Sequence, residues 1–339
     1  MLILVVGLDM SRKNPRSIIA NKRVAVLVNP MSARRKWQRY EKIQRYMRRK
    51  FQGRIHDEAV AKPGMIALAR RLSLVNDVLI ILGGDGTLAD VMQGVMEAGR
   101  AADVLIGIVP LGSGNAIRRS MGIPKVIAKA MRIVKFGTPR PIDLIDFEGR
   151  VASMVSIGAT AMTTLKTAQS SIRGIVGHAL ASRSLLLHPR DEMEIELFDG
   201  VDDKGEAFQR KSLKLRIFDC VVNKTNHFGY NWLIAPKARI NDGYLDVTLF
   251  DNRAYSYLFY FPLIYFGRYQ RILKHFKVKR IVVRGRNLHI QYNGEALAPR
   301  ESVDLRVIPD ALRVIGPRGK SSWPGPEPGE ALSWPGLKT

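Results

Sequence analysis

A glycine-rich turn that contains one carboxylate is the part of the sequence with the clearest chemical potential. It consists of Gly83, Gly84, Asp85, Gly86 and Thr87. The turn follows an apolar run over 78–82 and precedes a helical pattern over 88–98, which predicts a strand, a turn and a helix. Glycines let the backbone approach a ligand closely, and the start of a helix offers N–H groups and a positive dipole end to phosphate. The turn therefore predicts a nucleotide site.

Asp85 indicates that this turn does more than bind phosphate. A carboxylate repels a phosphate unless a cation or a proton-donating substrate lies between them. We therefore interpret the turn as a nucleotide site with chemistry attached. The alternative is an ordinary loop between a strand and a helix, in which Asp85 is a capping residue.

Two other polar turns follow apolar runs in the same half of the chain, after residues 23–28 and 104–109. Their candidate ligand-binding residues are Asn29, Ser32, Gly112, Ser113 and Asn115. Strands that are apolar throughout and alternate with helical patterns indicate a parallel sheet covered on both faces. Ligands of such sheets bind at the carboxyl ends of the strands, which is where all three turns lie.

The sequence after Asp143 has a different pattern. Strand-like segments, among them 213–223 and 230–234, lie between turns, and several of them alternate apolar and polar residues, which predicts an antiparallel sheet or sandwich. Two of the turns carry an acid, Asp242 after Asn241 and Glu295 after Gly294. Taken alone, both are readily explained as ordinary turn residues facing solvent.

The bulk composition limits the partners. The chain has 339 residues, which predicts two domains, and a formal net charge of +24, which attracts nucleic acid, nucleotide phosphates or an anionic membrane surface. Cys220 is the single cysteine, so an internal disulfide and a cysteine-based zinc site are excluded. The apolar runs are too short to span a bilayer, so we expect a cytoplasmic protein that touches membranes without crossing them.

Six motifs occur in order between residues 24 and 316. They are Asn29-Pro30-Met31-Ser32, Gly83-Gly84-Asp85-Gly86-Thr87-Leu88, Pro110-Leu111-Gly112-Ser113-Gly114-Asn115, Arg140-Pro141-Ile142-Asp143-Leu144, Asn241-Asp242-Gly243-Tyr244-Leu245-Asp246 and Asn293-Gly294-Glu295. Together they resemble the diacylglycerol kinase catalytic domain family, which includes bacterial lipid kinases, sphingosine kinases and ceramide kinases. The resemblance to the NAD kinases is more distant.

The resemblance implies an N-terminal three-layer α/β domain with a parallel sheet and a C-terminal antiparallel β-sandwich-like domain, with ATP in the cleft between them. We expect a nucleotide-binding domain at 23–142 with a returning strand at 305–316, and a β-rich lipid-substrate domain at 143–304. Residues 1–22 would form an N-terminal extension. Residues 317–339 are rich in proline, glycine and serine, which predicts a disordered tail.

The resemblance also implies ATP as co-substrate, Mg²⁺ as cofactor, and roles for particular residues. Glu295 matches the general base of bacterial members, whereas Asp85 matches the residue favoured in sphingosine kinases. We expect Glu295 to be the base and Asp85 to be essential. A structural Mg²⁺ site is implied at Asp242, with the backbone carbonyls of Arg239 and Tyr244 as further ligands. A plain turn is the alternative there.

The implied reaction transfers the γ-phosphoryl group of ATP to a lipid hydroxyl, and the expected substrate is diacylglycerol, which would become phosphatidic acid. A sphingoid-base or ceramide kinase and then a NAD kinase are the alternatives. A nucleic-acid-binding protein is the non-enzymatic alternative. Two departures from the family pattern bear on activity, because Ala33 stands where a glycine is usual and Asn293 where an aspartate is usual.

A strongly basic helical pattern spans residues 34–50, with nine lysines and arginines against the single acid Glu41. Its apolar side chains recur on one face, which predicts a helix packed on the core with a solvated basic back. That back also suits an anionic membrane surface. We therefore expect a lipid alcohol substrate, peripheral contact with the inner face of the membrane, and no nucleic-acid partner. The sequence leaves a homodimer open.

Overall fold

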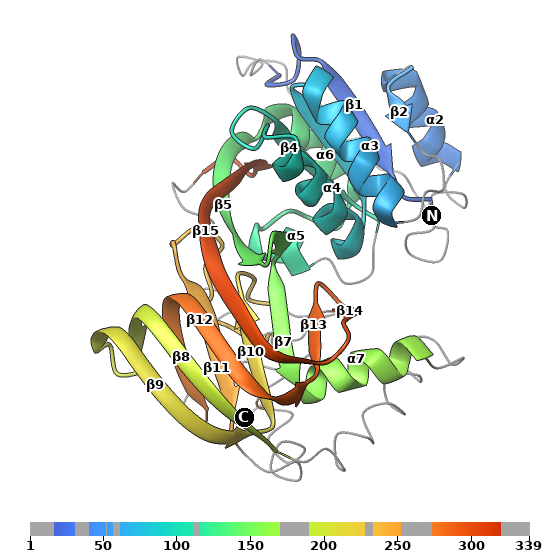
Figure 1. The fold of residues 1–339 in the computed structure, drawn as a ribbon. Helices are drawn as coiled ribbons and strands as arrows, with labels where there is room; N and C mark the ends of the chain where they lie inside the picture. The colour runs from blue at the N-terminus through green and yellow to red at the C-terminus, as the bar shows by residue number, and fades with distance from the viewer. Residues whose placement is uncertain are drawn as a thin grey trace, which may run out of the picture.

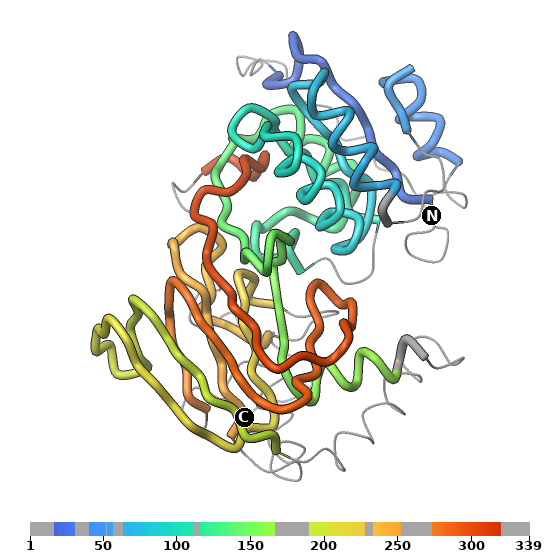
Figure 2. Tube along the Cα trace, in the orientation of Figure 1, coloured from blue at the N-terminus to red at the C-terminus, as the bar shows by residue number. Residues whose placement is uncertain are grey.

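The computed structural model describes residues 17–30, 41–51, 53–56, 62–111, 116–169, 190–227, 233–251, 263 and 273–319. Figure 1 shows two lobes, one with helices around a sheet and one made mainly of strands. Figure 2 shows that the chain passes between the lobes more than once. The fifteen strands of these described residues belong to one hydrogen-bonded sheet.

The N-terminal lobe is built on four parallel strands in the order β4, β3, β1, β2. They are β1 (Val24–Val28), β2 (Ile55–His56), β3 (Val78–Gly83) and β4 (Leu105–Pro110). β1, β3 and β4 are buried along their whole length, as expected for apolar strands covered on both faces. The pairs Val28 with Leu82 and Gly83 with Pro110 bring the carboxyl ends of these strands to one edge.

Helices cover both faces of this sheet. They are α2 (Glu41–Lys50), α3 (Lys62–Val75), α4 (Asp85–Glu97), α5 (Ala116–Ser120) and α6 (Ile127–Phe136). Leu72 of α3 and Val91 of α4 belong to the core on one face, whereas Met47 of α2 and Val134 of α6 belong to the core on the other. The predicted three-layer α/β domain is confirmed.

The C-terminal lobe is mainly antiparallel. Its elements are β6 (Arg150–Ala152), β7 (Met154–Gly158), α7 (Ala159–Gln169), β8 (Asp191–Asp202), β9 (Ala207–Ile217), β10 (Asp219–Asn223), β11 (Leu245–Phe250), β12 (Lys274–Leu288), β13 (Ile290–Tyr292) and β14 (Glu295–Ala296). The strands β14, β13, β7, β10, β11 and β12 are neighbours in that order, and β8 and β9 branch from β12. Ile157, Ile195, Val247 and Val283 lie in one buried core.

A long antiparallel pair of strands belongs to both lobes. It consists of β5 (Thr138–Phe147) and β15 (Arg300–Gly316), which run between the lobes in Figure 1. β15 pairs with β12 at Arg306 and with β4 at Arg313. Between these two parts the register shifts, and Asp310 has a positive φ of 47°. β15 therefore bends where it passes from one lobe to the other.

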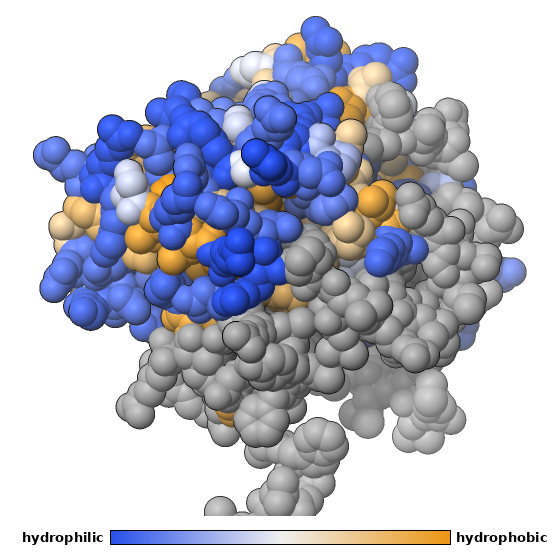
Figure 3. Space-filling view, turned by 60° about the horizontal axis from the view of Figure 1, so that its bottom comes forward, coloured by the Kyte–Doolittle hydropathy of each residue, from blue (hydrophilic) through white to orange (hydrophobic). Residues whose placement is uncertain are grey.

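The coloured part of the face seen in Figure 3 is mainly hydrophilic, with small hydrophobic patches between hydrophilic side chains. β9 ends one branch of the sheet, and among the described strands it pairs with β8 alone. Its exposed residues include Arg210, Lys214 and Arg216. Charged side chains on an edge strand oppose pairing with another chain.

Three predicted elements differ in detail from the structure. α4 begins at Asp85 and not at Leu88, because the glycine turn forms its first turn. The predicted strand over 213–223 is two strands, β9 and β10, that meet at Phe218. The predicted strand over 230–234 is absent at 233–234, and its first three residues lie outside the described residues.

Candidate active site

The three polar turns begin side by side at the carboxyl edge of the parallel strands. The backbone N–H of Asn29 donates to the carbonyl of Leu82 (3.1 Å), and that of Leu111 donates to the carbonyl of Gly83 (3.0 Å). These bonds place the starts of the first and third turns on either side of the second. The glycine turn therefore lies in the middle of this edge.

The glycine turn is packed on its inner side and open on its outer side. The side-chain amide of Asn29 donates to Thr87 Oγ1 (3.0 Å), which joins the end of β1 to the start of α4. A Cβ at Gly83 would lie 2.6 Å from Thr87 Cβ, so this position requires glycine. A Cβ at Gly86 would have no heavy atom within 4 Å. With Gly84 as its N-cap residue, α4 directs the positive end of its dipole to this edge.

Asp85 caps the helix that follows the third turn. Its Oδ2 accepts the N–H of Ala116 (3.0 Å), and its Oδ1 accepts that of Ile117 (3.3 Å). Both N–H groups belong to the first turn of α5, where a helix has no acceptors of its own. Asp85 is thus a capping residue, for α5 and not for its own helix. Its predicted part in catalysis stays a prediction.

α5 brings two cations that the sequence analysis did not single out, Arg118 and Arg119. Burial and the charge of Arg119 lower the pKa of the Arg118 guanidinium, whereas the nearby carboxylate of Asp85 opposes this change. Arg118 also donates to the carbonyl of Ile123. Guanidinium groups form strong hydrogen bonds with phosphate oxygens. The two consecutive arginines after the third polar turn are therefore the pattern in the sequence that could have indicated these cations.

The last residue of α5 contacts the C-terminal lobe. Ser120 Oγ donates to Asn226 Oδ1 (2.7 Å), and the N–H of Asn226 donates back to Ser120 Oγ (3.2 Å). The next residue is His227. Burial, together with the charges of Arg119 and Arg118, lowers the pKa of His227 to about 4. Its ring is therefore neutral near pH 7.

The turn between β13 and β14 is fastened to α4 through β6. Asn293 Oδ1 accepts the N–H of Ser153 (2.9 Å), and Asn293 Nδ2 donates to the carbonyl of Val151 (3.1 Å). The N–H of Val151 in turn donates to Gln93 Oε1 of α4 (2.8 Å). This chain of bonds connects the helix that begins with the glycine turn to the turn that carries Glu295.

The side chain of Asn293 therefore stabilises the turn that carries Glu295. Its φ of 48° lies in the left-handed region, which asparagine adopts more readily than most residues. An aspartate could accept from Ser153 but could not donate to Val151. Glu295 itself is exposed in β14, opposite Tyr292 of β13. Its predicted role as general base stays a prediction.

The predicted metal ligands Asp242 and Tyr244 surround a buried lysine. Lys224 Nζ lies 2.9 Å from Asp242 Oδ1, 2.5 Å from the carbonyl oxygen of Tyr244 and 3.0 Å from Asp143 Oδ2. Lys277 donates to Asp242 Oδ2. Burial would raise the pKa of the Asp242 carboxyl, but the charges and hydrogen bonds of Lys224 and Lys277 outweigh it and hold this pKa below its usual value.

This donor set does not fit a divalent cation. Two of the three predicted ligand atoms, the Asp242 carboxylate and the Tyr244 carbonyl, already accept hydrogen bonds from an ammonium group. The third predicted ligand, the backbone carbonyl of Arg239, stays a prediction. Across the part of the chain that the structure describes, no group of three or more His, Cys, Asp or Glu side chains is arranged to hold a metal ion.

Some predicted residues cannot be placed. Four predicted nucleotide-binding residues lie outside the described residues, namely Ser32, Gly112, Ser113 and Asn115, as does Ala33. Of the helices that are described, none has the length and apolar character needed to cross a membrane.

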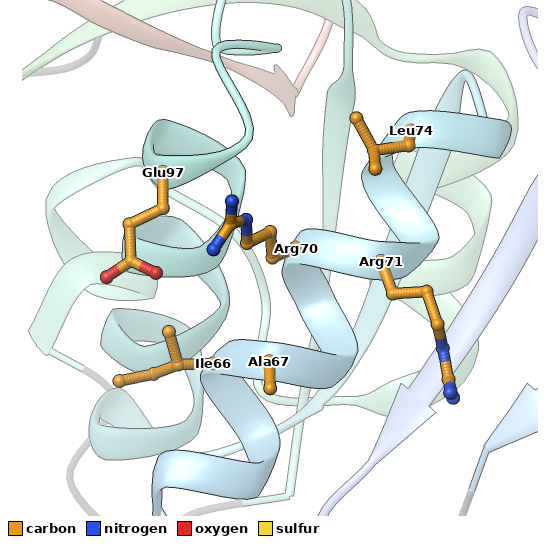
Figure 4. A pocket seen from close by; sticks show the side chains of 6 residues that line it. All are labelled: Ile66, Ala67, Arg70, Arg71, Leu74 and Glu97. Atoms are coloured by element: carbon orange, nitrogen blue, oxygen red, sulfur yellow. The ribbon is translucent and has the colours of Figure 1, made fainter.

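A surface groove lies at the other end of α4. Its lining residues are Ile66, Ala67, Arg70, Arg71, Leu74 and Glu97 (Figure 4). Five of them belong to α3, and Glu97 ends the thirteen-residue helix that Asp85 begins. A helix of this length spans roughly 18 Å. The groove is therefore separate from the glycine turn.

Two family descriptions match consecutive parts of the chain. Residues 23–147 match the diacylglycerol kinase catalytic domain, and residues 153–316 match the YegS C-terminal NAD kinase beta sandwich-like domain. The boundary between the matches falls at β6, between the end of β5 and the start of β7. The predicted β-sandwich-like character of the second domain is confirmed.

Proteins with established descriptions resemble the chain over most of its length. A diacylglycerol kinase of Bacillus subtilis (strain 168) is 27% identical over 236 residues, which are 67% of this chain and 73% of that protein. A protein named "Probable lipid kinase YegS" from Salmonella arizonae is 25% identical over 245 residues, which are 72% of this chain and 79% of that protein.

A crystal structure of a diacylglycerol kinase from Bacillus anthracis strain Sterne has the same fold. It superposes with a TM-score of 0.63 and 17% sequence identity, covering 87% of this chain and 97% of that one. At this level of identity the likeness concerns the fold alone. It agrees with the predicted pairing of a parallel α/β domain with a β-sandwich-like domain.

Proposed function

We propose that the chain is an ATP-dependent lipid kinase of the diacylglycerol kinase catalytic domain family and that its substrate is diacylglycerol, which it converts to phosphatidic acid. In this reaction the lipid hydroxyl oxygen bonds to the γ-phosphorus of ATP. The bond from that phosphorus to the β–γ bridging oxygen breaks, and ADP leaves with the electron pair. The hydroxyl proton passes to a carboxylate of the protein.

The start of α4 is the proposed site of the nucleotide phosphates. The observation that carries the proposal is that the glycine turn, the Asn29–Thr87 pair and the Asp85-capped α5 meet at one edge of the parallel sheet. Backbone N–H groups and a helix dipole favour phosphate there. The open side of the turn at Gly86 leaves room for the phosphates.

Mg²⁺ is proposed to enter the site together with ATP. It usually takes one or two carboxylates plus substrate phosphates as ligands, all through oxygen. Asp85 provides such a carboxylate in the glycine turn. Each of its oxygens accepts a neutral backbone N–H, and a carboxylate oxygen has a second lone pair that can bind a metal ion, so the residues fit this role. When bound, Mg²⁺ supplies neutralisation of the negative charge on the phosphate oxygens.

Glu295 is proposed to accept the hydroxyl proton. Its side chain is exposed, on a turn that Asn293 fastens to the backbone of β6 and β7. Both oxygens of Asp85 accept backbone N–H groups of α5, which suits Asp85 to orienting the phosphate site.

We further propose that the solvent side of α2 contacts anionic lipid at the inner face of the membrane. Met47 and Ile43 pack on the core. The exposed cations of α2 are Lys42, Arg45, Arg48, Arg49 and Lys50. Each cation near such a surface contributes about 1 kcal/mol. We expect salt-sensitive sedimentation with phosphatidylglycerol vesicles but not with phosphatidylcholine vesicles; equal binding to both would contradict this contact.

The reaction is tested with purified protein, radiolabelled ATP and Mg²⁺ in four parallel reactions. The acceptors are diacylglycerol, a sphingoid base, a ceramide and NAD⁺. We expect label in chloroform-extractable phosphatidic acid and none in the other products. Label in a different lipid or in NADP⁺ would replace the proposed substrate. No label with any acceptor would contradict the proposed reaction.

Glu295→Gln tests the proposed base. We expect the rate of lipid phosphorylation to fall by roughly 10²-fold or more at unchanged Tm, because the amide cannot accept the proton. Glu301→Gln changes another exposed glutamate, on β15, and serves as the matched control. A Glu295→Gln variant as active as the control would refute the assignment of the base.

A further inference from the structure

A lysine is fully buried where the two lobes meet. Lys224 directly follows β10, and its side chain has no exposed surface. Its backbone N–H donates to the carbonyl of Ser153 (2.9 Å), which directly precedes β7. Lysines are almost never fully buried unless they are paired. The groups that pair with this buried ammonium group therefore need to be identified.

The number of oxygens around Lys224 equals its number of N–H donors. An ammonium group has three donors and no acceptor. Three oxygens lie within 3.0 Å of Nζ, one each from Asp143, Asp242 and the backbone of Tyr244. The contacts with Asp242 and Tyr244 are hydrogen bonds and the contact with Asp143 is an ion pair, so two carboxylates face the buried positive charge.

The two carboxylates in turn hold backbone from several elements. Asp143, on β5, accepts the N–H of Asp310 (3.0 Å) at the bend of β15. It also accepts the N–H of Gly243 (2.8 Å), in the turn before β11. The same turn donates from the N–H of Tyr244 to Asp242 (3.3 Å). The ammonium group thus lies at the centre of the contacts that join β5 and β15, which pass between the lobes in Figure 1, to the C-terminal lobe.

Two ammonium groups already face the carboxylates of Asp143 and Asp242, because Lys277 contacts the second oxygen of Asp242. Asp246 adds a third carboxylate, 3.7 Å from Lys277 Nζ and 3.2 Å from His275 Nε2. A divalent cation at this turn would either displace Lys224 from its oxygens or lie against it. If the metal ion displaced Lys224, the buried ammonium group would lose its partners. If the metal ion bound beside Lys224, two cations would repel each other in a poorly solvated site.

We propose that the ammonium group of Lys224 is a built-in replacement for a structural divalent cation at the turn that holds Asp242. The lysine supplies the positive charge and the fixed donors that join the carboxylates to the turn, and it cannot dissociate. The junction between the lobes therefore keeps its shape without Mg²⁺ or Ca²⁺. Any Mg²⁺ dependence of this protein then belongs to its nucleotide.

Thermal unfolding without nucleotide tests this proposal directly. We expect the Tm of the wild-type chain to be the same within error in EDTA, Mg²⁺ and Ca²⁺. We also expect mass spectrometry of the dialysed protein to find no stoichiometric metal. A Tm that rises with Mg²⁺ in the wild type and no longer does so in Asp242→Asn would overturn the proposal.

Substitution of Lys224 provides the complementary test. Lys224→Ser removes the ammonium and opens space between two carboxylates, so we expect a Tm lower by on the order of 10 °C and largely restored by Mg²⁺ or Ca²⁺. Lys224→Met fills that space, and we expect a similar loss without restoration. If both variants fail to fold, the wild-type and Asp242→Asn measurements still decide the question.

Lys277→Met is the matched control. It removes an ammonium group from the same carboxylate but leaves Lys224 and its three oxygens in place. We expect this variant to remain insensitive to divalent cations. Restoration of Lys277→Met by Mg²⁺, with no restoration of Lys224→Ser, would place the cation requirement elsewhere and refute the assignment to Lys224.

Discussion

Asn293→Asp gives the turn before Glu295 the aspartate expected from the family resemblance, and we expect it to destabilise this chain without raising its activity. Asn293 Nδ2 donates to the carbonyl of Val151 at 3.1 Å, while Oδ1 accepts the N–H of Ser153 at 2.9 Å. An aspartate keeps the second bond, but it replaces the donor with an oxygen that faces another acceptor. Because both residues tolerate the φ of 48°, the backbone contributes little to the difference.

The lost bond sets the magnitude. A part-buried acceptor left without its donor costs about 1–3 kcal/mol. The retained bond to Ser153 strengthens because its acceptor becomes charged, which returns about 0.5–1 kcal/mol. We therefore expect the free energy of unfolding to fall by about 0.5–2 kcal/mol. At about 2–4 °C per kcal/mol, this corresponds to a fall in Tm of roughly 1–8 °C.

Thermal and urea unfolding followed by circular dichroism measure this change. Asn287→Asp is the matched control, because Asn287 is exposed and also has a positive φ, of 55°. We expect the control to stay within about 0.5 kcal/mol of the wild type. An unchanged Tm for Asn293→Asp, together with faster lipid phosphorylation, would show that this side chain serves the nucleotide and not the backbone of β6 and β7. That result would refute the reasoning.

Two further predictions concern packing and pH. Gly83→Ala places a Cβ 2.6 Å from Thr87 Cβ, so we expect a lower Tm than for Gly86→Ala, whose Cβ meets no heavy atom within 4 Å; equal Tm values would contradict the close packing. The pKa of His227 is about 4 in the folded chain and 6.5 in the unfolded reference, so only the unfolded chain takes up this proton as the pH falls between those values. The unfolding free energy is therefore unaffected by His227 above pH 6.5 and decreases as the pH falls toward 4. Over this range the unfolding free energy of the wild type should fall relative to that of His227→Gln by up to about 3 kcal/mol. If urea unfolding gave the same pH dependence for both proteins, this prediction would be contradicted.

The parallel sheet and the glycine turn could be predicted because their signals are local. β3 is a continuous apolar run that ends at the turn, and the structure has it at Val78–Gly83. The start of α4 at Asp85 could not be predicted, since glycines at 84 and 86 are poor helix formers and indicate a loop. The capping of α5 by Asp85 depends on the third turn returning beside the second, which no local pattern reveals.

Of the two strands that join the lobes, β15 lies where the resemblance implies a returning strand at 305–316, whereas β5 could not be predicted from the local sequence. β5 contains Pro139 and Pro141, which argue against a strand. They are tolerated because, among the described strands, that part of β5 pairs with β15 alone, and pairing with β6 begins at Ile145. In the sequence, nothing distinguishes Lys224 from the many other cations of this basic chain. Only folding brings it to carboxylates from β5 and from the turn before β11.

The position of β15 has a consequence for how the chain is made. β15 lies beside β4 in the sheet, although β4 ends at Pro110 and β15 begins at Arg300. A ribosome therefore produces the whole β-rich lobe before it releases the strand that covers the β4 edge. Until then that edge presents backbone groups to which other nascent chains can add. We expect translation that stops before residue 300 to yield aggregates or degraded protein and no free nucleotide-binding lobe.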